Sequence, residues 1–370
     1  MNIFELFREI IIFIDKKELH YIFNPPINPL LWEIGHVLWF YNYFYNRLHN
    51  ESKYELYLKN LPNEIYDSFK LHYNNRNKVN LTDINTCLEI LNDFKNIKDE
   101  LCILHLHMHL ESFLFSIQYL KINNPFIKNL IPNITLINDI EWININGGEF
   151  IQGNDSNDFS FDNELPFFKN KVNDFISSKY PITIYQYSLF IKDNGYLKEK
   201  YWDKNGWFWL KENKITLPLN WEIKDKEYYY LNYSIDLIGD YPMICSFYEA
   251  QAYCNWKNVK LLTESEFEYL AKKEIIKGYQ NLNYQGLIRV QENSDLIGNI
   301  WNWCDTNFYP YDGFKIGYPY EEFSYPFFGY KKICRGGSWA TPKELAKSYY
   351  RNAQLPNTQH QYIGFRVKKI

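Results

Sequence analysis

Two histidines lie one helical turn apart in a segment that reads His-Leu-His-Met-His (residues 105–109). Residues i and i+4 share one face of a helix, so His105 and His109 can direct their rings at the same point. His107 is rotated by roughly 200° from His105 at 3.6 residues per turn and cannot join them. Two neutral imidazoles at this spacing form a chelating pair, as in helical His-Glu-x-x-His zinc sites. The spacing therefore predicts a metal site.

A third ligand would have to come from another part of the chain, and His36 is the strongest candidate. It lies in an apolar stretch, residues 31–40, where burial of an unpaired ring costs about 1–3 kcal/mol. Metal ligation would satisfy this ring, but a hydrogen-bonded structural role is the commoner one for a core histidine. Glu33 and Glu111 are alternative ligands, since two histidines and one carboxylate often hold non-haem iron. Three ligands on one face leave open positions for O₂ and substrate, which favours iron(II) over a closed structural zinc.

The elements that position these side chains belong to a helical N-terminal half. Residues 1 to about 130 contain almost no Gly, and their apolar residues recur every three or four positions. This pattern predicts a helix bundle. Pro125 and Pro132 lie in a stretch of turn residues, 124–133, that we interpret as a linker. The length of the chain then favours two domains, residues 1–132 and residues 140–370.

The composition of the chain changes from about residue 140, where Gly and Trp become common and short runs are bounded by turns. This texture predicts an irregular α+β domain. Helices are expected over residues 185–192 and 246–255. A further helix is expected to begin at Thr263, because Thr263 and Glu266 form a capping-box pattern.

Composition and charge restrict the classes of partner. The formal net charge is −4 and no long basic block is present, so we expect no nucleic-acid partner. Six scattered cysteines without a Cys-x-x-Cys pair predict a reduced, intracellular protein. Glu5 and Arg8 interrupt the N-terminal stretch where a signal peptide would be apolar, and no apolar run approaches the roughly 18 residues of a membrane span. We expect a cytoplasmic protein without a membrane partner.

Several motifs resemble a known family. Residues 28–40, Asn-Pro-Leu-Leu-Trp-Glu-Ile-Gly-His-Val-Leu-Trp-Phe, resemble the first metal motif of the DinB-like bundle in the ergothioneine sulfoxide synthases. Residues 105–111, His-Leu-His-Met-His-Leu-Glu, resemble the second. The C-terminal half resembles the formylglycine-generating-enzyme fold, which is C-type-lectin-like. Its matching segments are residues 147–150, 161–164, 181–183, 260–268, 298–303, 335–339 and 364–366.

This resemblance implies an α+β chain with a DinB-like bundle followed by a formylglycine-generating-enzyme-like domain. It also implies that His36, His105 and His109 hold Fe(II). Enzymes of the EgtB (ergothioneine), OvoA (ovothiol) and SenA (selenoneine) types use O₂ to join a thiol or a selenium donor to the imidazole of hercynine or histidine. The motifs of this chain look nearest to the SenA type.

The resemblance further implies a tyrosine beside the metal that steers the oxidation. The segment from residue 308 to residue 320 supplies the candidates, Tyr309 or Tyr311 first and then Tyr320. Because the chain contains 33 tyrosines, a core or surface role is the alternative for each of them.

Substrate-binding residues are implied at Arg351, Asn352 and Gln354, and at Met108, where the family often has glutamine. In the synthases that use a dipeptide thiol, a Trp-Asp and then an Arg follow the Arg-Asn pair and grip the substrates. Residues 353–358 of this chain read Ala-Gln-Leu-Pro-Asn-Thr instead. A charged clamp for a carboxylate is therefore missing at that place. The donor is then either uncharged, such as a selenosugar, or gripped elsewhere.

Other readings of the chain remain open. Formylglycine-generating enzymes need two cysteines after the Gly-Gly-Ser segment, but no cysteine follows Cys334, and the aligned positions fall near Thr341 and Ala346. A copper-thiolate site of that kind cannot form.

Asn299 and backbone oxygens of residues 298–303 are a candidate calcium site. The rival functions are a non-catalytic or binding relative of this fold and a DinB-type metal hydrolase.

Overall fold

The computed structural model divides the chain into two compact units. The first comprises Met1–Leu120 together with Tyr318–Tyr320, and the second comprises Lys121–Gly317 and Glu321–Ile370. The predicted linker, residues 124–133, lies outside the described residues. The structure describes residues 2–19, 24–49, 61–78, 84–94, 99–123, 139–224, 227–232, 235–237, 239–276, 280–284, 286–290 and 296–370.

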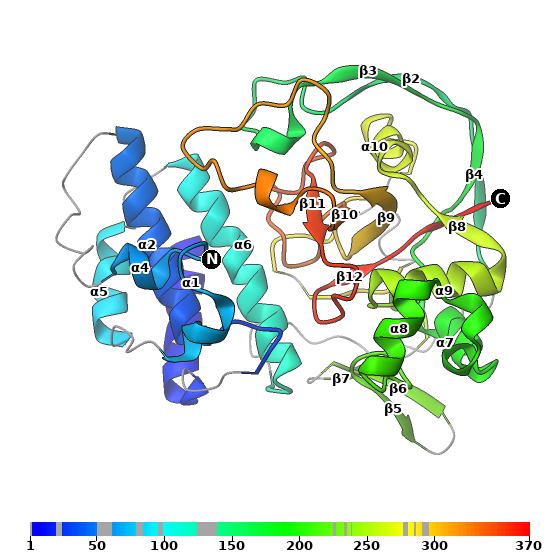
Figure 1. Cartoon of the computed structure of the whole chain (residues 1–370), viewed down its shortest axis with the longest axis horizontal. Coiled ribbons are helices and arrows are strands. Elements are labelled where there is room, and N and C mark those ends of the chain that lie inside the picture. The colour runs from blue at the N-terminus through cyan, green and yellow to red at the C-terminus, as the bar shows by residue number, and fades with distance from the viewer. Residues whose placement is uncertain are drawn as a thin grey trace. The chain divides into compact units, whose positions relative to one another are not determined.

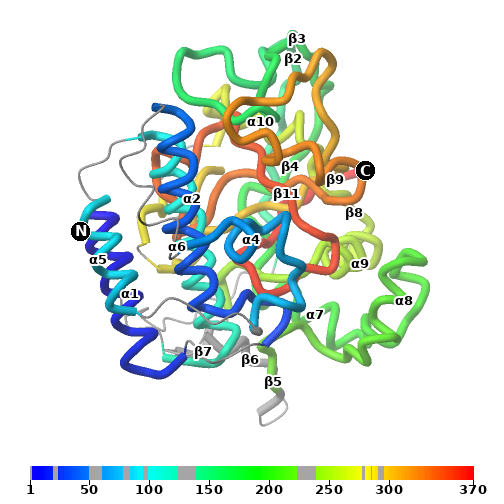
Figure 2. Tube along the Cα trace, turned by 60° about the vertical axis from the view of Figure 1, so that its left-hand side comes forward, coloured from blue at the N-terminus to red at the C-terminus, as the bar shows by residue number. Residues whose placement is uncertain are grey.

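The first unit is built from helices, as the apolar periodicity predicted. Helix α2 and helix α6 lie side by side in it (Figures 1 and 2). Asp99 caps the start of α6, where its carboxylate accepts a hydrogen bond from the backbone N–H of Cys102. The helices of this unit are α1 (Ile3–Lys16), α2 (Leu30–His49), α4 (Asn63–Tyr66), α5 (Ile84–Phe94) and α6 (Glu100–Tyr119), with the 3₁₀ helix η2 (Tyr73–Lys78).

Helix α2 is the central element of the first unit. Its residues from Leu30 to Asn42 are all buried, which is the behaviour of a helix that is apolar on every side. Gly35 allows α4 to approach α2 closely, because a Cβ at this position would lie only 2.1 Å from Cε1 of Tyr66. This close approach brings the backbone of Tyr66 to the neighbourhood of His36.

The second unit mixes helices with small sheets, which confirms the predicted α+β class. One sheet has the order β1-β4-β13-β8, and a second has the order β11-β10-β9-β12 with β12 parallel to β9. Strands β2 and β3 form a pair, and β5, β6 and β7 form a three-stranded sheet. The strands are β1 (Trp142–Ile145), β2 (Gly148–Gln152), β3 (Phe168–Val172), β4 (Phe175–Ser178), β5 (Trp221–Lys224), β6 (Glu227–Asn232), β7 (Ile235–Leu237), β8 (Val259–Leu261), β9 (Trp301–Asn307), β10 (Lys332–Arg335), β11 (Asn352–Gln354), β12 (Ile363–Gly364) and β13 (Val367–Lys369).

The longer helices of the second unit begin at capping residues that the sequence indicates. The predicted helices at 185–192 and 246–255 are confirmed as α7 (Ile184–Lys192) and α9 (Phe247–Lys257). The capping box of Thr263 and Glu266 opens α10 (Glu264–Lys272), as predicted. The remaining elements are α8 (Lys204–Glu212), η3 (Asp162–Glu164), η4 (Gly195–Leu197), η5 (Glu199–Tyr201) and η6 (Tyr325–Phe327). Among the described residues, no helix is both long and apolar enough to cross a membrane.

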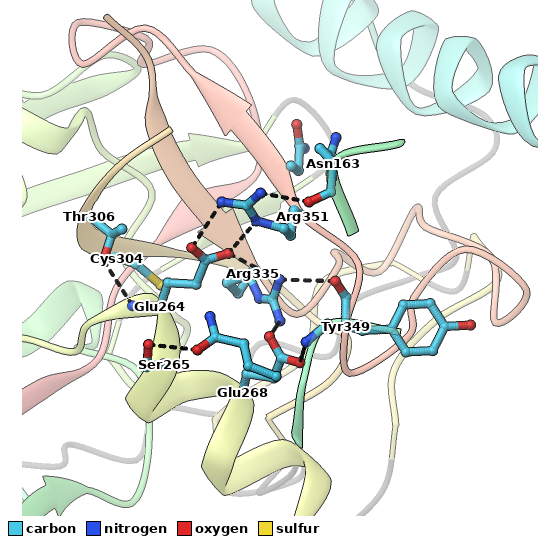
Figure 3. A network of polar contacts seen from close by, with 12 residues as sticks. Asn163, Glu264, Ser265, Glu268, Cys304, Thr306, Arg335, Tyr349 and Arg351 are labelled. Carbon is cyan, nitrogen blue, oxygen red and sulfur yellow. Dashed lines mark hydrogen bonds and ion pairs between the residues drawn. The ribbon is translucent and has the colours of Figure 1, made fainter. Parts of the chain in front are cut away.

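A buried ionic network joins α10 to the strands of the second unit (Figure 3). Nη2 of Arg335 donates to Oε2 of Glu268 over 2.7 Å, and Nε of Arg351 donates to Oε1 of Glu264 over 2.7 Å. Burial disfavours the charged form of Glu264, but Arg351 and Arg335 together outweigh burial and lower the pKa of its carboxyl. The two carboxylates of one helix are thus tied to β10 and to the residue that precedes β11.

Candidate metal centre

The predicted histidines come together inside the first unit. One ring nitrogen from each of His36, His105 and His109 lies within 4.8 Å of those of the other two. The ring centroids are 5.3 Å apart for His36 and His105, 4.9 Å for His36 and His109, and 4.6 Å for His105 and His109. His36 comes from α2, and the other two come from adjacent turns of α6. Helix packing therefore supplies what the sequence spacing alone could not, the position of the third ring.

Hydrogen bonds at Nδ1 fix the orientation of two of the three rings, those of His36 and His109. Nδ1 of His36 lies 2.8 Å from the backbone oxygen of Tyr66, and Nδ1 of His109 lies 2.7 Å from Oε1 of Glu33. Both oxygens are acceptors, so each Nδ1 carries a proton, and the neutral form of each ring then has its lone pair on Nε2. Carboxylate and carbonyl acceptors behind histidine ligands are the usual supporting contacts of metal sites. Glu33 thus acts behind His109, whereas the sequence alone left it as an alternative ligand.

The donor set fits a divalent transition metal. His105 is buried, its Nδ1 has no hydrogen-bond partner among the described residues, and its ring stacks on Phe40 with 3.4 Å between centroids. An unpartnered buried ring nitrogen is costly unless it binds a proton donor or a metal. Aromatic rings also flank His36, which stacks on Trp32 at 5.1 Å and on Trp39 at 5.6 Å. Three imidazole nitrogens in apolar walls suit iron or zinc, and they leave coordination positions open.

Burial keeps two of the three imidazoles, those of His36 and His105, neutral. It lowers the pKa of His36 and of His105 well below the usual value of 6.5, and the nearby His109 lowers both further. Burial also lowers the pKa of His107 and of His360 to about 4. A metal ligand must be the neutral imidazole. His36 and His105 are therefore already in the protonation state that a metal requires at pH 7.

We expect NMR titration of the histidine rings in metal-free protein to show this directly. An unfolded histidine takes up a proton as the pH falls through about 6.5. Because their folded pKa is depressed, His36 and His105 should remain neutral at pH 6.0, and His107 should titrate only near 4. Single His→Gln variants assign the resonances. A ring of His36 or His105 that titrates at or above 6.5 would contradict the burial argument.

The Glu33→Gln variant is expected to weaken metal binding while keeping the fold. The Glu33 side chain is fully buried, and glutamine has nearly the same shape but carries no charge behind His109. Loss of such a supporting carboxylate typically weakens metal affinity by about 10- to 100-fold. Competition titration with a chelator measures the change. Glu100→Gln, an exposed position in the first turn of α6, is the control, and equal affinities for both variants would rule out this role of Glu33.

The three candidate tyrosines lie in different surroundings. Tyr320 belongs to the first unit, where its ring contacts Phe40 at 5.0 Å and His105 at 6.2 Å between centroids. Tyr309 and Tyr311 belong to the second unit. Tyr309 is exposed, and Tyr311 is buried under the guanidinium of Arg351, 4.0 Å from its ring centroid. The structure thus brings one candidate, the last in the predicted order, next to the histidines.

The candidate substrate residues are likewise divided between the units. Met108 lies on α6 beside His109 and is half-buried. Arg351 donates to both oxygens of Glu264, to the backbone oxygen of Asn163 and to that of Tyr309. No pattern of residue types indicated these partners, which lie 42 to 188 residues away along the chain.

Two further candidates lie on β11, and a third lies in the proposed calcium loop. Oδ1 of Asn352 accepts from the backbone N–H of Ala353 and from Nε2 of Gln354. The side chain of Asn299 accepts from the backbone N–H of Ile288 and donates to the oxygen of the same residue. Because its oxygen also accepts from Asn281, these contacts give no support to a calcium site.

Two residues that shape the metal centre, Arg76 and Tyr66, were not predicted from the sequence. Arg76 lies over the Trp32 ring, 4.1 Å from its centroid. Its positive charge lowers the pKa of His36, and it interacts electrostatically with the carboxylate of Glu33. The carbonyl of Tyr66 orients His36, but a backbone oxygen leaves no trace in the residue type. One supporting contact did have a signal in the sequence. Glu33 lies three residues before His36, on the same helix face, and its carboxylate contacts His109.

The comparisons with known proteins agree with this architecture. The model of the sulfatase-modifying factor enzyme 1-like domain family (FGE-sulfatase) matches residues 135–294 and 291–369. These ranges cover more than half of the chain, and the chain belongs to this family.

Similar curated proteins extend the match to the helical part. A hercynine oxygenase of Mycolicibacterium smegmatis is 24% identical over 95% of this chain and 94% of its own length. A hercynine oxygenase of Mycobacterium tuberculosis is 27% identical over 59% of this chain and 58% of its own length. The formylglycine-generating enzyme of Mus musculus is 22% identical over 61% of this chain and 74% of its own length. The hercynine oxygenases confirm the predicted resemblance to the EgtB/OvoA family.

Proposed function

We propose that this chain is an Fe(II)- and O₂-dependent synthase that forms a carbon–sulfur or carbon–selenium bond on the imidazole of hercynine or histidine. The observation that carries the proposal is the group of His36, His105 and His109, whose nitrogens lie within 4.8 Å of one another. Similarity to a hercynine oxygenase over 95% of the chain supports the choice of an imidazole substrate and of iron.

The chemistry requires a four-electron oxidation. For a thiol donor, the imidazole C–H and the S–H bonds break, and a C–S and an S–O bond form. O₂ supplies the sulfoxide oxygen, and its other atom leaves as water with the two hydrogens. Bound iron would supply the activation of O₂ that this reaction needs.

The residues of the chain have separate roles in this proposal. His36, His105 and His109 hold the metal and leave one side open to O₂ and substrate. Tyr320, whose ring lies by His105, is the acid or hydrogen donor at the open side, ahead of Tyr309 and Tyr311. Phe40 and Trp39 exclude water from the histidine rings, since both are buried against them.

The donor is proposed to lack a carboxylate that needs a charged clamp at β11. The stretch that follows Arg351 offers Asn352 and Gln354, and Arg351 itself is occupied by Glu264. A selenosugar fits these polar, uncharged groups better than a dipeptide thiol does. Met108, beside His109, is the candidate apolar contact for the imidazole substrate.

A mass-spectrometric product screen tests the proposal. Iron-loaded protein is offered hercynine or histidine, each with cysteine, γ-glutamylcysteine or a selenosugar, under air. A product that carries sulfur or selenium on the imidazole ring supports the proposal, and the favoured pair names the donor. Absence of any such product with all six pairs, in protein that binds iron, would favour the non-catalytic relative.

A further inference from the structure

The three residues Tyr318–Tyr320 form the tip of a loop whose two ends are tied to a single carboxylate. The chain leaves the second unit after Gly317, contributes this tip to the first unit, and returns at Glu321. The backbone N–H of Gly317 lies 3.4 Å from Oδ2 of Asp162, and the hydroxyl of Ser324 donates to Oδ1 of the same residue. Asp162 therefore joins the chain before the tip to the chain after it.

Neighbouring contacts tighten this base. Nδ2 of Asn163 donates to Oγ of Ser324 over 2.9 Å, and the Phe323 ring stacks on Phe161 with 4.1 Å between centroids. Residue 317 approaches Asp162 so closely that a Cβ there would lie 2.9 Å from the Cβ of Asp162. Ser324 is fully buried, so the base excludes water from these hydrogen bonds. The motif Phe-Asp-Asn-Glu (residues 161–164), which the reaction itself does not use, supplies this support.

Arg47 holds the tip of the loop inside the first unit. Its Nη1 donates to the backbone oxygen of Pro319 over 2.9 Å, and its guanidinium lies over the Tyr318 ring, 4.9 Å from the centroid. The Tyr318 hydroxyl donates back to the carbonyl of Arg47 over 3.1 Å. The tip is thus held by two hydrogen bonds and a cation–π contact to one residue of α2.

The position of Arg47 on α2 explains why Tyr320 lies near the histidine rings. Arg47 follows His36 by eleven residues, about three turns, so both lie on the same face of the helix. Phe40 and Phe44 lie between them on that face. The Tyr320 ring packs on both, at 5.0 and 5.1 Å between centroids, and its centroid lies 6.2 Å from that of the His105 ring.

We propose that Arg47 and Asp162 are positioning residues that hold Tyr320 at the open side of the histidine cluster. This inference rests on the proposed function, in which Tyr320 takes part in the oxidation. The contacts that anchor the loop at Arg47 and Asp162 do not involve the three histidines, and in this proposal both residues act through the tyrosine. A misplacement of a reacting group by about 1 Å can reduce a rate by about 100-fold, which makes such anchoring effective.

A double-mutant cycle tests whether Arg47 acts through Tyr320. Arg47→Ala is expected to lower kcat for product formation by about 10- to 100-fold, with bound iron retained. In the Tyr320→Phe background the same change should cost less than about twofold, because the residue it positions has lost its hydroxyl. Arg47→Lys, which keeps a donor for the Pro319 oxygen, should recover part of the rate. Lys315→Ala, an exposed cation of the same loop, is the control and should leave kcat unchanged.

Asp162 is tested in the same cycle with Asp162→Asn, whose amide NH₂ replaces one acceptor that Gly317 and Ser324 need. Ser324→Ala removes the hydrogen bond from the Ser324 hydroxyl to Asp162, and it replaces Asp162→Asn in the cycle if that variant does not fold. If a variant lowers kcat by the same factor in the wild-type and Tyr320→Phe backgrounds, the positioning role is overturned and only a structural role is left. Unchanged kcat in both the Arg47 and the Asp162 variants, with Tyr320→Phe impaired, would overturn it as well.

Chymotrypsin cleavage after Tyr320 gives a readout that does not depend on activity. Release of the tip in Arg47→Ala should speed cleavage of the Tyr320–Glu321 bond, mapped by mass spectrometry, relative to wild type and Lys315→Ala. An unchanged rate would contradict the anchoring. Faster cleavage in a protein that forms no product and consumes no O₂ would instead overturn the proposed function, and with it any role in positioning a catalytic tyrosine.

Discussion

Replacement of His105 by alanine is expected to abolish stoichiometric iron binding and product formation together. His105 faces both other rings, at 5.3 Å from His36 and 4.6 Å from His109, so its loss leaves only two nitrogens of the set. Removal of the ring also leaves a space beside Phe40, which stacks on it. Metal analysis after anaerobic loading with Fe(II) measures the effect.

His107→Ala is the matched control for this experiment, because it removes an imidazole from the same helix, two residues away. His107 is no member of the cluster that the described residues form. The His107→Ala variant should retain iron and most of the activity. Unchanged iron content in His105→Ala, or equal loss in the two variants, would contradict the assignment of the metal ligands.

The largest expected effect on stability follows from replacement of Arg335 by methionine. The Arg335 side chain is fully buried and donates to Glu268 over 2.7 Å (Figure 3). It also donates to the backbone oxygen of Ser348 over 2.7 Å. Methionine fills a similar volume but removes the cation from Oε2 of the buried Glu268 carboxylate, and Lys272, 3.6 Å from Oε1, is the cation that stays beside it. Breaking a buried pair in this way costs about 3–5 kcal/mol of the free energy of unfolding.

Guanidinium unfolding followed by tryptophan fluorescence tests this prediction. Nine of the eleven tryptophans belong to the second unit, so their signal reports mainly on that unit. Lys343→Met, at an exposed position of the same unit, should change the free energy of unfolding by less than about 0.5 kcal/mol. A similarly small change in Arg335→Met would show that the network contributes little to stability.

The local features of the fold were predictable because they depend on neighbours in sequence. The capping box at Thr263 and the spacing of His105 and His109 each involve residues three or four positions apart. The same is true of the apolar stretch that became α2. These patterns report helix starts and helix faces directly.

The parts of the site that sequence did not predict depend on tertiary contacts. The acceptor for His36 is a carbonyl 30 residues away, and Tyr320, whose ring lies beside His105, was only the last of the three candidate tyrosines. Arg351 looked like a substrate ligand from its place in a motif, but its guanidinium lies against Glu264, 87 residues away. Such pairings follow from how helices and strands pack, which residue types alone do not specify.

Measurement of O₂ uptake in iron-loaded protein distinguishes a synthase from a protein that only binds hercynine. Protein loaded with Fe(II) without air is mixed with hercynine and the donor favoured by the product screen, and O₂ is then admitted. We predict one O₂ consumed for each carbon–sulfur or carbon–selenium bond formed, and no such uptake in His36→Ala. Binding of hercynine to iron-loaded wild-type protein without O₂ uptake would contradict the account and leave a binding protein built on the same fold.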